Sequence, residues 1–491
     1  MSGAGRGLSF SVAVLNHRRP TLLKRVLTAV SQLDHSNFEV VVVGDQPSLD
    51  SYALPDWLVD QVKYVSFPDA NICRSRNLAV EASAGDIIAF IDDDAVPEPD
   101  WLRRLSRAFR FGSVGGVGGL VRKDDGVRIE WAGGLFNRAA VEEPLPVRDE
   151  VRVFDADSQM YGDQFIGTMG ANSAFRREAL LSVGGFDQSI RYYLDETDIM
   201  LRLAEAGWDA AFVRSAEVHH LREANAVRDS LRTPRNLFQI AASKAYFCRR
   251  HLPGDQVAEE LMRFREEKIW ELDPYIRLGL IRCREREQLR RQITDGITDG
   301  LARSATLPLD ADAVPPKFQR FQVPVPSVSV AICSGWGVSD QLRAASLARR
   351  LASCGARVSF IGFRSGHKRL SVSFEDGVWW HRGGTWRLDQ RHEGRWVIGR
   401  AGRARAEIAR AAARRRFDIV LTCYPELTAE PISLPQHTGP LYARAAPGTK
   451  LPLEKAVDRL LDAAKLTSRP THLPQTADLK PAENQVSTVP G

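Results

Sequence analysis

The sequence predicts an α/β fold for about the first 225 residues, followed by a helical region and a smaller Rossmann-like α/β unit. Three observations support this prediction: apolar runs alternate with amphipathic stretches, several runs are too uniformly apolar to face water, and acidic residues follow the strand ends. Continuous β-branched runs are typical of parallel strands that are buried on both faces. Single helices between such strands imply βαβ units with right-handed crossovers.

The elements of the first hundred residues follow this alternation. An apolar strand over 8–15 precedes a helix that begins at Pro20 and runs through Leu33. The following elements are strands over 38–44 and 62–67, a helix over 73–84 and a strand over 86–91. In open α/β sheets, ligands bind outside the carboxyl ends of the strands. The residues that follow these strands are therefore the first candidates for a site.

Acidic residues occupy those positions. Asp45 follows the second strand, and Asp92, Asp93 and Asp94 follow the fourth. Three adjacent carboxylates repel one another unless a cation or a positive ligand neutralises them. Oxygen ligands of this kind favour Mg²⁺ or Mn²⁺, ions that usually bridge to substrate phosphates. The competing interpretation of the triplet is a solvated acidic turn, or a helix N-cap that leads into residues 97–109.

Length and composition narrow the class of protein. The chain has 491 residues, 44% of them hydrophobic and 26% charged, which predicts a soluble globular protein of two or three domains. No apolar stretch approaches about 18 residues, so no transmembrane helix is predicted. Residues 1–7 lack the apolar core of a signal peptide. Six scattered cysteines without metal-binding spacing predict reduced thiols in a cytoplasmic protein.

The positive charge is concentrated in one stretch. The whole chain carries 67 Lys and Arg against 61 Asp and Glu, whereas residues 341–420 alone carry 18 against 6. A solvated cationic face is the favoured interpretation, followed by contact with anionic lipid heads or a phosphorylated carrier. No motif for RNA or DNA binding accompanies the charge, so we predict no nucleic-acid partner. Any peripheral contact with the inner face of the membrane is expected to use this stretch.

Several segments between residues 11 and 220 resemble family 2 glycosyltransferases. Each segment is short, but they occur in the family's order along the chain. The segments are Ser11–Pro20, Ala70–Val80, Ala89–Asp94 with Pro97 and Trp101, Gly167–Arg177 with Gly184–Asp187, and Asp195–Arg202 with His220. The resemblance implies a GT-A nucleotide-diphospho-sugar transferase fold and an inverting, metal-dependent transfer from a nucleotide diphosphate sugar.

The resemblance also assigns residues to the donor. Asp45 matches the acid that binds the nucleobase edge, and Arg76 matches a residue near the base and ribose. Asp92 matches the ribose-side acid of the Asp-x-Asp motif. Asp93 is expected to contact the nucleotide sugar, and it remains an alternative additional ligand of the metal. Ile72 stands where the family often has Gly, so the backbone there is expected to approach the donor differently.

The resemblance assigns the metal ligands and the general base in the same way. Asp94 matches the metal ligand, with Mn²⁺ or Mg²⁺ as the expected cofactor, and His220 fits the imidazole at the end of a later strand. His219 stays open as an alternative ligand. Glu196 falls on the family's general base, where an Asp is usual, and Asp195 falls on the preceding Glu. An acidic neighbour raises the pKa of a carboxyl and so suits a base.

Other interpretations of the same residues compete. A phosphatase of the haloacid-dehalogenase type would use Asp92 as nucleophile and Asp94 as acid/base, but it places its aspartates after the first strand of its domain. A sugar-nucleotidyltransferase usually carries a Gly-rich loop where this chain has residues 15–19. Asp195 and Glu196 could also simply complement a helix dipole. The rival of another class is a non-catalytic nucleotide-sugar-binding scaffold.

Residues 327–423 more weakly resemble the amino-terminal half of family 4 GT-B glycosyltransferases. The matching pieces are Gly335–Gly337, Leu347–Leu351, Gly355–Val358 and Phe417–Val420. That family holds the donor nucleotide mainly with its second half, and too little ordered sequence follows Cys423 to build one. We therefore expect a basic accessory domain here.

The chain thus divides into five predicted segments. They are a GT-A domain over 1–225, a helical extension over 226–307, a linker over 308–326, a basic Rossmann-like accessory domain over 327–424, and a mostly disordered tail over 425–491. The predicted activity is transfer of a sugar to a hydroxyl acceptor, either a glycan, a lipid-linked molecule or a small molecule. This activity would serve glycan, polysaccharide or glycolipid biosynthesis.

Overall fold

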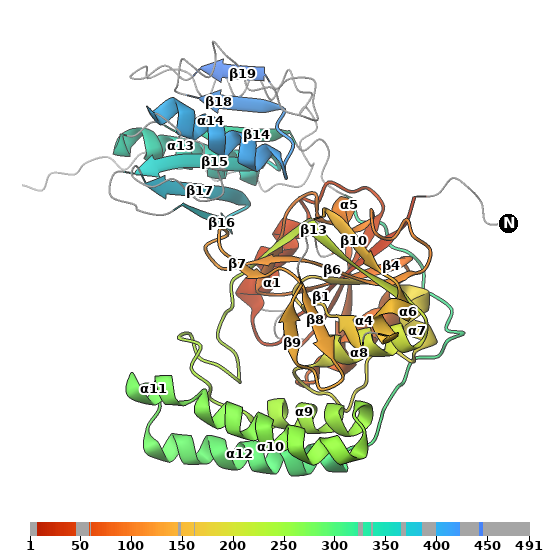
Figure 1. Cartoon of the computed structure of the whole chain (residues 1–491). Helices are drawn as coiled ribbons and strands as arrows, with labels where there is room; N and C mark the ends of the chain where they lie inside the picture. Colours follow the sequence, from red (N-terminus) through yellow and green to blue (C-terminus); the bar gives the residue numbers. More distant parts are fainter. Residues whose placement is uncertain are drawn as a thin grey trace, which may run out of the picture.

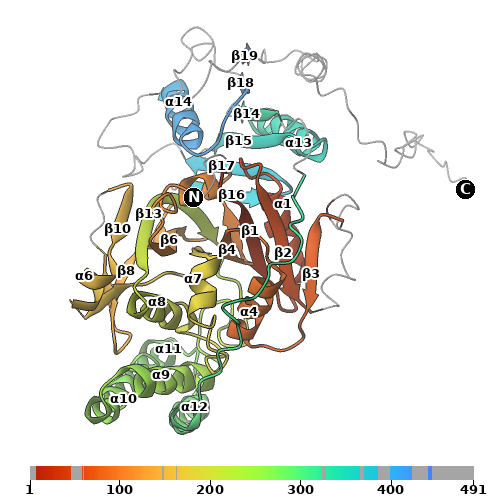
Figure 2. The same cartoon turned by 90° about the vertical axis from the view of Figure 1, so that its right-hand side faces the viewer.

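The computed structural model places a helical layer and a second α/β unit on opposite sides of a first α/β domain (Figures 1 and 2). It describes residues 7–45, 58, 60–145, 149–161, 163–322, 328–334, 337–364, 370–384, 399–422 and 441–444. None of the helices in these ranges is long and apolar enough to cross a membrane.

The first domain begins with the parallel strands that the sequence predicts. They are β1 (Phe10–Leu15), β2 (Phe38–Gly44), β3 (Val62–Ser66) and β4 (Ile87–Asp92), in the order β3-β2-β1-β4. Helices α1 (Pro20–Val30) and α4 (Ile72–Ala82) connect them, and β2 is buried along its whole length, as its β-branched sequence requires. Asp45 and Asp92–Asp94 therefore lie at the same edge of the sheet.

The remainder of this sheet is mixed. Beyond β4 the order continues β12 (Ser173–Arg176), β6 (Val114–Arg122), β13 (Asp209–His220) and β10 (Val151–Phe154), with β12 antiparallel to both neighbours. Short strands β5 (Ala95–Pro97) and β7 (Ile129–Trp131) pair at its rim, while β8 (Gly134–Asn137), β9 (Glu142–Pro144) and β11 (Gln164–Ile166) form a small second sheet. The prediction of an α/β fold for this domain is confirmed.

Four further helices lie in the described part of this domain: α5 (Trp101–Leu105), α6 (Ala156–Tyr161), α7 (Arg177–Ser182) and α8 (Asp195–Glu205). The helix expected over 97–109 is thus shorter, because Ala95–Pro97 pairs with β13 instead. Asn172 of the Gly-Ala-Asn segment joins three strands. Its amide nitrogen donates to the carbonyls of Leu120 and Ala216, and its oxygen accepts from Trp101 Nε1.

The helical layer consists of α9 (Phe238–His251), α10 (Gly254–Trp270), α11 (Asp273–Arg277) and α12 (Cys283–Ala302). It is anchored to the first domain by two aspartates that belong to the resemblance segments. Asp187 accepts a hydrogen bond from Tyr246 at 2.5 Å, and Asp198 lies 2.8 Å from His251 Nε2. These acids therefore hold the layer in place.

The connector that leaves α12 packs along the first domain. The Leu309 amide donates to the Gly184 carbonyl, and the Phe321 amide donates to the Phe38 carbonyl at 2.8 Å. The Phe321 ring also stacks on Phe38, with the ring centres 5.1 Å apart. The connector thus runs back across the domain, as Figure 2 shows.

The second α/β unit holds a six-stranded sheet in the order β16-β17-β15-β14-β18-β19. The strands are β14 (Ser329–Cys333), β15 (Arg357–Arg364), β16 (Ser371–Glu375), β17 (Val378–Gly384), β18 (Ile419–Thr422) and β19 (Leu441–Arg444), all parallel except β16. Helices α13 (Val338–Ser353) and α14 (Gly399–Ala412) flank them. Residues 335–336 and the predicted tail, apart from 441–444, lie outside the described residues. Within the tail predicted over 425–491, residues 441–444 form β19.

The two α/β units meet through buried ion pairs. Arg415 makes a bidentate pair with Glu98 at 2.8 and 2.9 Å, and Arg414 donates to Glu217 at 2.6 Å. Gln32 Nε2 donates to the Gly377 carbonyl at 2.8 Å. The expectation of a solvated cationic face is therefore wrong for Arg414 and Arg415, which neutralise acids of the first domain. Among the described cysteines, three are buried, two are exposed, and none forms a disulfide.

Candidate active site

The end of β4 and the end of β13 bring together three groups that can hold a metal ion. Ligand atoms of Asp92, Asp94 and His220 all lie within 4.8 Å of one another. His220 Nε2 is 3.4 Å from Asp94 Oδ1, and its Nδ1 is 3.2 Å from Glu130. Two carboxylates and an imidazole, backed by a further carboxylate, form a donor set that suits Mn²⁺ or Mg²⁺.

The structure separates the two adjacent histidines. Side chains of consecutive strand residues point to opposite faces. His220 turns toward Asp94, whereas His219 Nε2 lies 2.8 Å from Glu98 and its ring packs against Trp379 of the second unit. His220 is thus the histidine beside the acidic triplet.

Electrostatics in this cluster favour a bound cation. Burial lowers the pKa of His220, but the neighbouring Asp94 and Glu130 outweigh it and raise the pKa to about 10. Burial raises the pKa of Asp94, but the hydrogen bond from His220 and the charge of Arg19 lower it to about 2. The carboxylates thus attract positive charge to the space between them. A divalent ion would supply such charge.

Arg19 of the first loop neutralises part of the triplet. Its guanidinium lies 2.5 Å from Asp93 and 3.2 Å from Asp94, and Asn16 donates to Asp93 at 2.7 Å. Burial, together with the adjacent acids, raises the pKa of Asp93 to about 7. No individual role was predicted for Arg19 or Asn16, although both lie in the segment that resembles the family.

The candidate base lies at the start of α8. Arg76 of α4 donates from Nε to Asp195 and from Nη2 to Glu196, both at 2.9 Å. The Arg76 side chain is fully buried and lies against the rings of Phe90 and Phe186. The resemblance placed Arg76 near the base and ribose, but its guanidinium contacts the acids of α8 instead. A donor-binding role for Arg76 stays a prediction.

The environment of Glu196 suits a proton acceptor. Burial and the adjacent Asp195 raise its pKa well above the ordinary value, against the opposing charge of Arg76. A carboxylate with a raised pKa is more basic and remains useful near neutral pH. In the structure, Asp195 and Glu196 share the guanidinium of Arg76.

The backbone around this pair is unusual. Tyr193 and Leu194, just before the pair, have φ angles of 72° and 67° in the left-handed region, which costs energy for residues other than glycine. Gly170 lies directly against the pair, since a Cβ there would overlap Glu196 Oε1 and Arg76 Nη2. The glycine in the Gly-Thr-Met-Gly segment thus leaves room for the carboxylate.

Asp45 occupies the predicted position at the end of β2. It is 6% exposed, and its Oδ1 accepts a hydrogen bond of 2.6 Å from the Arg18 amide. This contact ties Asp45 to the loop that also carries Arg19. Its proposed role at the nucleobase edge stays a prediction.

Residues 11–184 match the model of the family described as glycosyl transferase family 2. This segment is thus similar to family 2 glycosyltransferases. The resemblance found in the sequence is thereby confirmed. The matched segment contains the acidic triplet, Arg76 and Gly170, whereas His220 and the acids of α8 follow it.

Two relatives and a solved structure are similar to parts of the chain. Succinoglycan biosynthesis protein ExoM of Rhizobium meliloti is 32% identical over 23% of this chain and 39% of its own length. Glucosyl-dolichyl phosphate glucuronosyltransferase of Haloferax volcanii is 28% identical over 33% of this chain and 51% of its own length. The structure of GalNAc-T7 with UDP, GalNAc and Mn²⁺ covers 53% of this chain and 54% of its own, with 18% identity and a TM-score of 0.38. The chain thus spans about half or less of the length of these two curated relatives.

Proposed function

We propose that the chain transfers a sugar from a nucleotide diphosphate sugar to a hydroxyl acceptor, with inversion and with a divalent metal. The observation that carries the proposal is the grouping of Asp92, Asp94 and His220 at the ligand-binding edge of a domain that is similar to family 2 glycosyltransferases. Asp94 and His220 would hold Mn²⁺ or Mg²⁺, with Asp92 beside them. When bound, such an ion supplies electrostatic stabilisation of the leaving diphosphate.

The chain's own residues supply the remaining chemistry. Asp45, Asp92 and Asp93 would bind and orient the nucleotide sugar. The acceptor hydroxyl oxygen forms a bond to the anomeric carbon while the bond from that carbon to the diphosphate oxygen breaks, and the electron pair leaves with the diphosphate. Glu196 takes the hydroxyl proton, and Arg76 holds Glu196 and Asp195 in position.

Support for the acceptor class comes from the relatives. One is named for succinoglycan biosynthesis and another for a glucosyl-dolichyl phosphate substrate. We propose a glycan or a lipid-linked molecule as the acceptor, in glycan or glycolipid biosynthesis. A cytoplasmic location with peripheral membrane contact through residues 341–420 belongs to the same proposal, and would use arginines of that stretch other than the pair that faces the first domain.

A panel of nucleotide diphosphate sugars tests the donor assignment. We expect one donor to raise the melting temperature only when Mn²⁺ or Mg²⁺ is present, because a ligand that binds the folded state stabilises it by mass action. The Asp94→Ala variant should lose this shift. A donor that stabilises the wild type and this variant equally, with or without metal, would contradict the assigned metal site.

A further inference from the structure

A cavity of about 420 Å³ lies between the first domain and the second α/β unit. We call it the arginine pocket, because five arginines and a single carboxylate, Asp34, line it: Arg103, Arg357, Arg414, Arg415 and Arg416. Residues at the amino ends of β14, β15 and β17 line it. None of the metal or base residues lines it. A volume of this size suits a small ligand.

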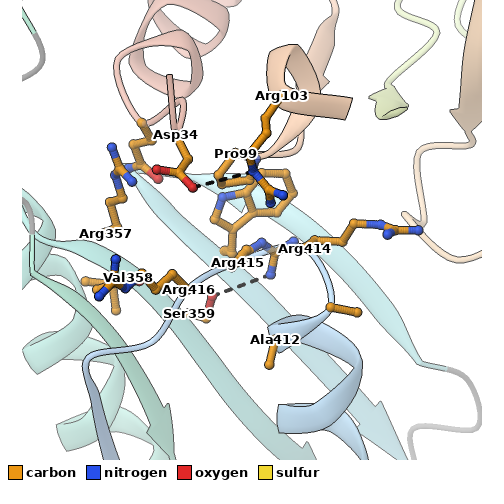
Figure 3. Close-up of a pocket in the computed structure, with 14 residues that line it drawn as sticks. Asp34, Pro99, Arg103, Arg357, Val358, Ser359, Ala412, Arg414, Arg415 and Arg416 are labelled. Carbon is orange, nitrogen blue, oxygen red and sulfur yellow. Dashed lines mark hydrogen bonds and ion pairs between the residues drawn. The ribbon is translucent and has the colours of Figure 1, made fainter. Parts of the chain in front are cut away.

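The arginines approach the pocket from both units. Figure 3 shows Arg103 and Asp34 on the side of the first domain, with Arg357 and the Arg414–Arg416 segment opposite them. Arg414 and Arg415 already pair with Glu217 and Glu98. Arg357 differs from them, because it makes no ion pair with any described residue and donates only to the Leu33 carbonyl, at 3.1 Å. Burial lowers the pKa of this guanidinium, against the opposing charges of Asp34 and Asp418.

Three donors that line the pocket are buried and have no acceptor among the described residues. They are Arg103 Nε, Arg357 Nε and Trp379 Nε1. Arg103 Nε lies 3.8 Å from Asp34, too far for a hydrogen bond. Trp379 is only 2% exposed, and an indole nitrogen can only donate. Buried donors are normally satisfied, so three in one cavity indicate a ligand that supplies acceptors.

One acceptor in the pocket is also unsatisfied. Gln32 Oε1 has no partner, while Gln32 Nε2 is fixed by the Gly377 carbonyl, which sets the orientation of the amide. A ligand with an anionic, acceptor-rich group and at least one hydroxyl would satisfy all four atoms. Guanidinium groups match phosphate oxygens in charge and geometry.

We propose that the arginine pocket binds the phosphate group of a small, hydroxyl-bearing ligand, with Arg357 as its principal partner. The ligand would bridge the two units, because its partners Arg103 and Gln32 belong to the first domain and Arg357 and Trp379 to the second. This site is separate from the donor site, so its proposal does not depend on the proposed function.

The test is calorimetric titration of the full chain without added metal. The probes are inorganic phosphate, glucose 1-phosphate and UDP, each at constant ionic strength set with chloride. We expect binding by the wild type and at least a tenfold loss in Arg357→Met. Arg349→Met is the matched control, because Arg349 is an exposed arginine of the same unit that does not line the pocket. Tighter binding of glucose 1-phosphate than of phosphate would support the hydroxyl contact.

A further variant and a melting measurement keep the proposal open to refutation. Trp379→Phe removes only the indole donor and should weaken binding several-fold. Arg357→Met should melt at or above the wild-type temperature without phosphate, since it removes an unpaired buried charge, yet it should lose the phosphate-induced rise. Equal phosphate affinity in wild type and Arg357→Met would overturn the proposal. So would phosphate binding that disappears in Asp94→Ala, because the phosphate would then occupy the metal site.

Discussion

At the scale of single residues, Glu196 sets the expected pH dependence of transfer. Burial and Asp195 raise its pKa, and a base acts only when deprotonated. The transfer rate should therefore fall as the pH drops through this raised pKa, at a pH well above the ordinary value of 4.5 for a glutamate. The measurement is a pH profile of kcat/KM at saturating metal. An acid limb below pH 4.5 would contradict the raised basicity.

The two adjacent histidines provide a matched pair of substitutions. His220→Ala removes the imidazole beside Asp94 and should weaken Mn²⁺ binding by about tenfold to a hundredfold. His219→Ala removes a contact to Glu98 at the boundary between the two units and should leave Mn²⁺ affinity unchanged. Titration of Mn²⁺ by calorimetry compares them directly. The reverse order of effects would transfer the ligand role to His219.

A substitution at Gly170 tests the position of the candidate base without replacing an ionisable residue. A methyl group at this position would overlap Glu196 and Arg76, so Gly170→Ala should reduce kcat while Mn²⁺ affinity is retained. Gly254→Ala is the control, since nothing lies within 4 Å of a Cβ there. Normal turnover by Gly170→Ala would show that the carboxylate need not occupy its observed position.

Residue types and order predicted the acidic triplet, the pair at the start of α8 and the histidine pair. They could not distinguish His219 from His220, because the choice depends on which face of β13 meets the metal cluster. Glu130 and Gly170 were also missed as contributors to the site. Glu130 comes from a short rim strand without a motif, and the need for glycine at 170 becomes visible only where Glu196 packs against it.

At the scale of elements, α12 packs on α9 through glycines. A Cβ at Gly300 would overlap the carbonyl oxygen of Ala242, and one at Gly296 would overlap that of Phe238. Gly300→Ala should therefore lower the free energy of unfolding by about 1–3 kcal/mol, despite the better helix propensity of alanine. Gly254→Ala, with open space around it, should be neutral or slightly stabilising. Equal melting temperatures of both variants would contradict the close packing.

The hydrophobic pattern predicted the early parallel strands closely and the later strands poorly. β1 to β4 are continuous apolar runs, so each is recognisable alone. β6 is rich in glycine, and β8, β9 and β11 are short, so their pairing depends on distant partners such as Asn172, which joins β6, β12 and β13. Local periodicity carries no information about such partners.

At the scale of the whole molecule, a buried ionic network joins the basic unit to the acidic domain. His381 contacts Glu407 and Arg415, and burial lowers its pKa from 6.5 to about 4. Between these pH values the unfolded chain binds more protons than the folded chain. The contribution of His381 to the free energy of unfolding is therefore present above pH 6.5 and is lost as the pH falls toward 4. The shift corresponds to roughly 3 kcal/mol.

Melting curves between pH 7 and 4 measure this loss. The melting temperature of the wild type should fall across the interval, and His381→Gln should show a shallower fall because it removes the titrating group. Glu217, whose pKa the adjacent Arg122 and Arg414 lower to about 2 despite its burial, should contribute a separate loss at lower pH. A pH dependence that is identical in wild type and His381→Gln would contradict the role of His381.

The charge asymmetry of the sequence predicted a basic module but not its use. Arg414 and Arg415 appear in the sequence as part of a solvated stretch, and only the fold places them against Glu217 and Glu98. Charge counts do not specify which side chains become buried. The division of the chain into domains likewise stays a prediction, although the described sheets and helices follow it.

The most direct test of the central claim is the release of nucleoside diphosphate from nucleotide diphosphate sugars by the full chain with Mn²⁺. We expect release by the wild type, its abolition by chelation, and a loss of about a hundredfold or more in Glu196→Gln with donor binding retained. Glu205→Gln, an exposed position on the same helix, should behave as wild type. Undiminished release by Glu196→Gln, or by the chelated wild type, would contradict the assignment of the base or of the metal site.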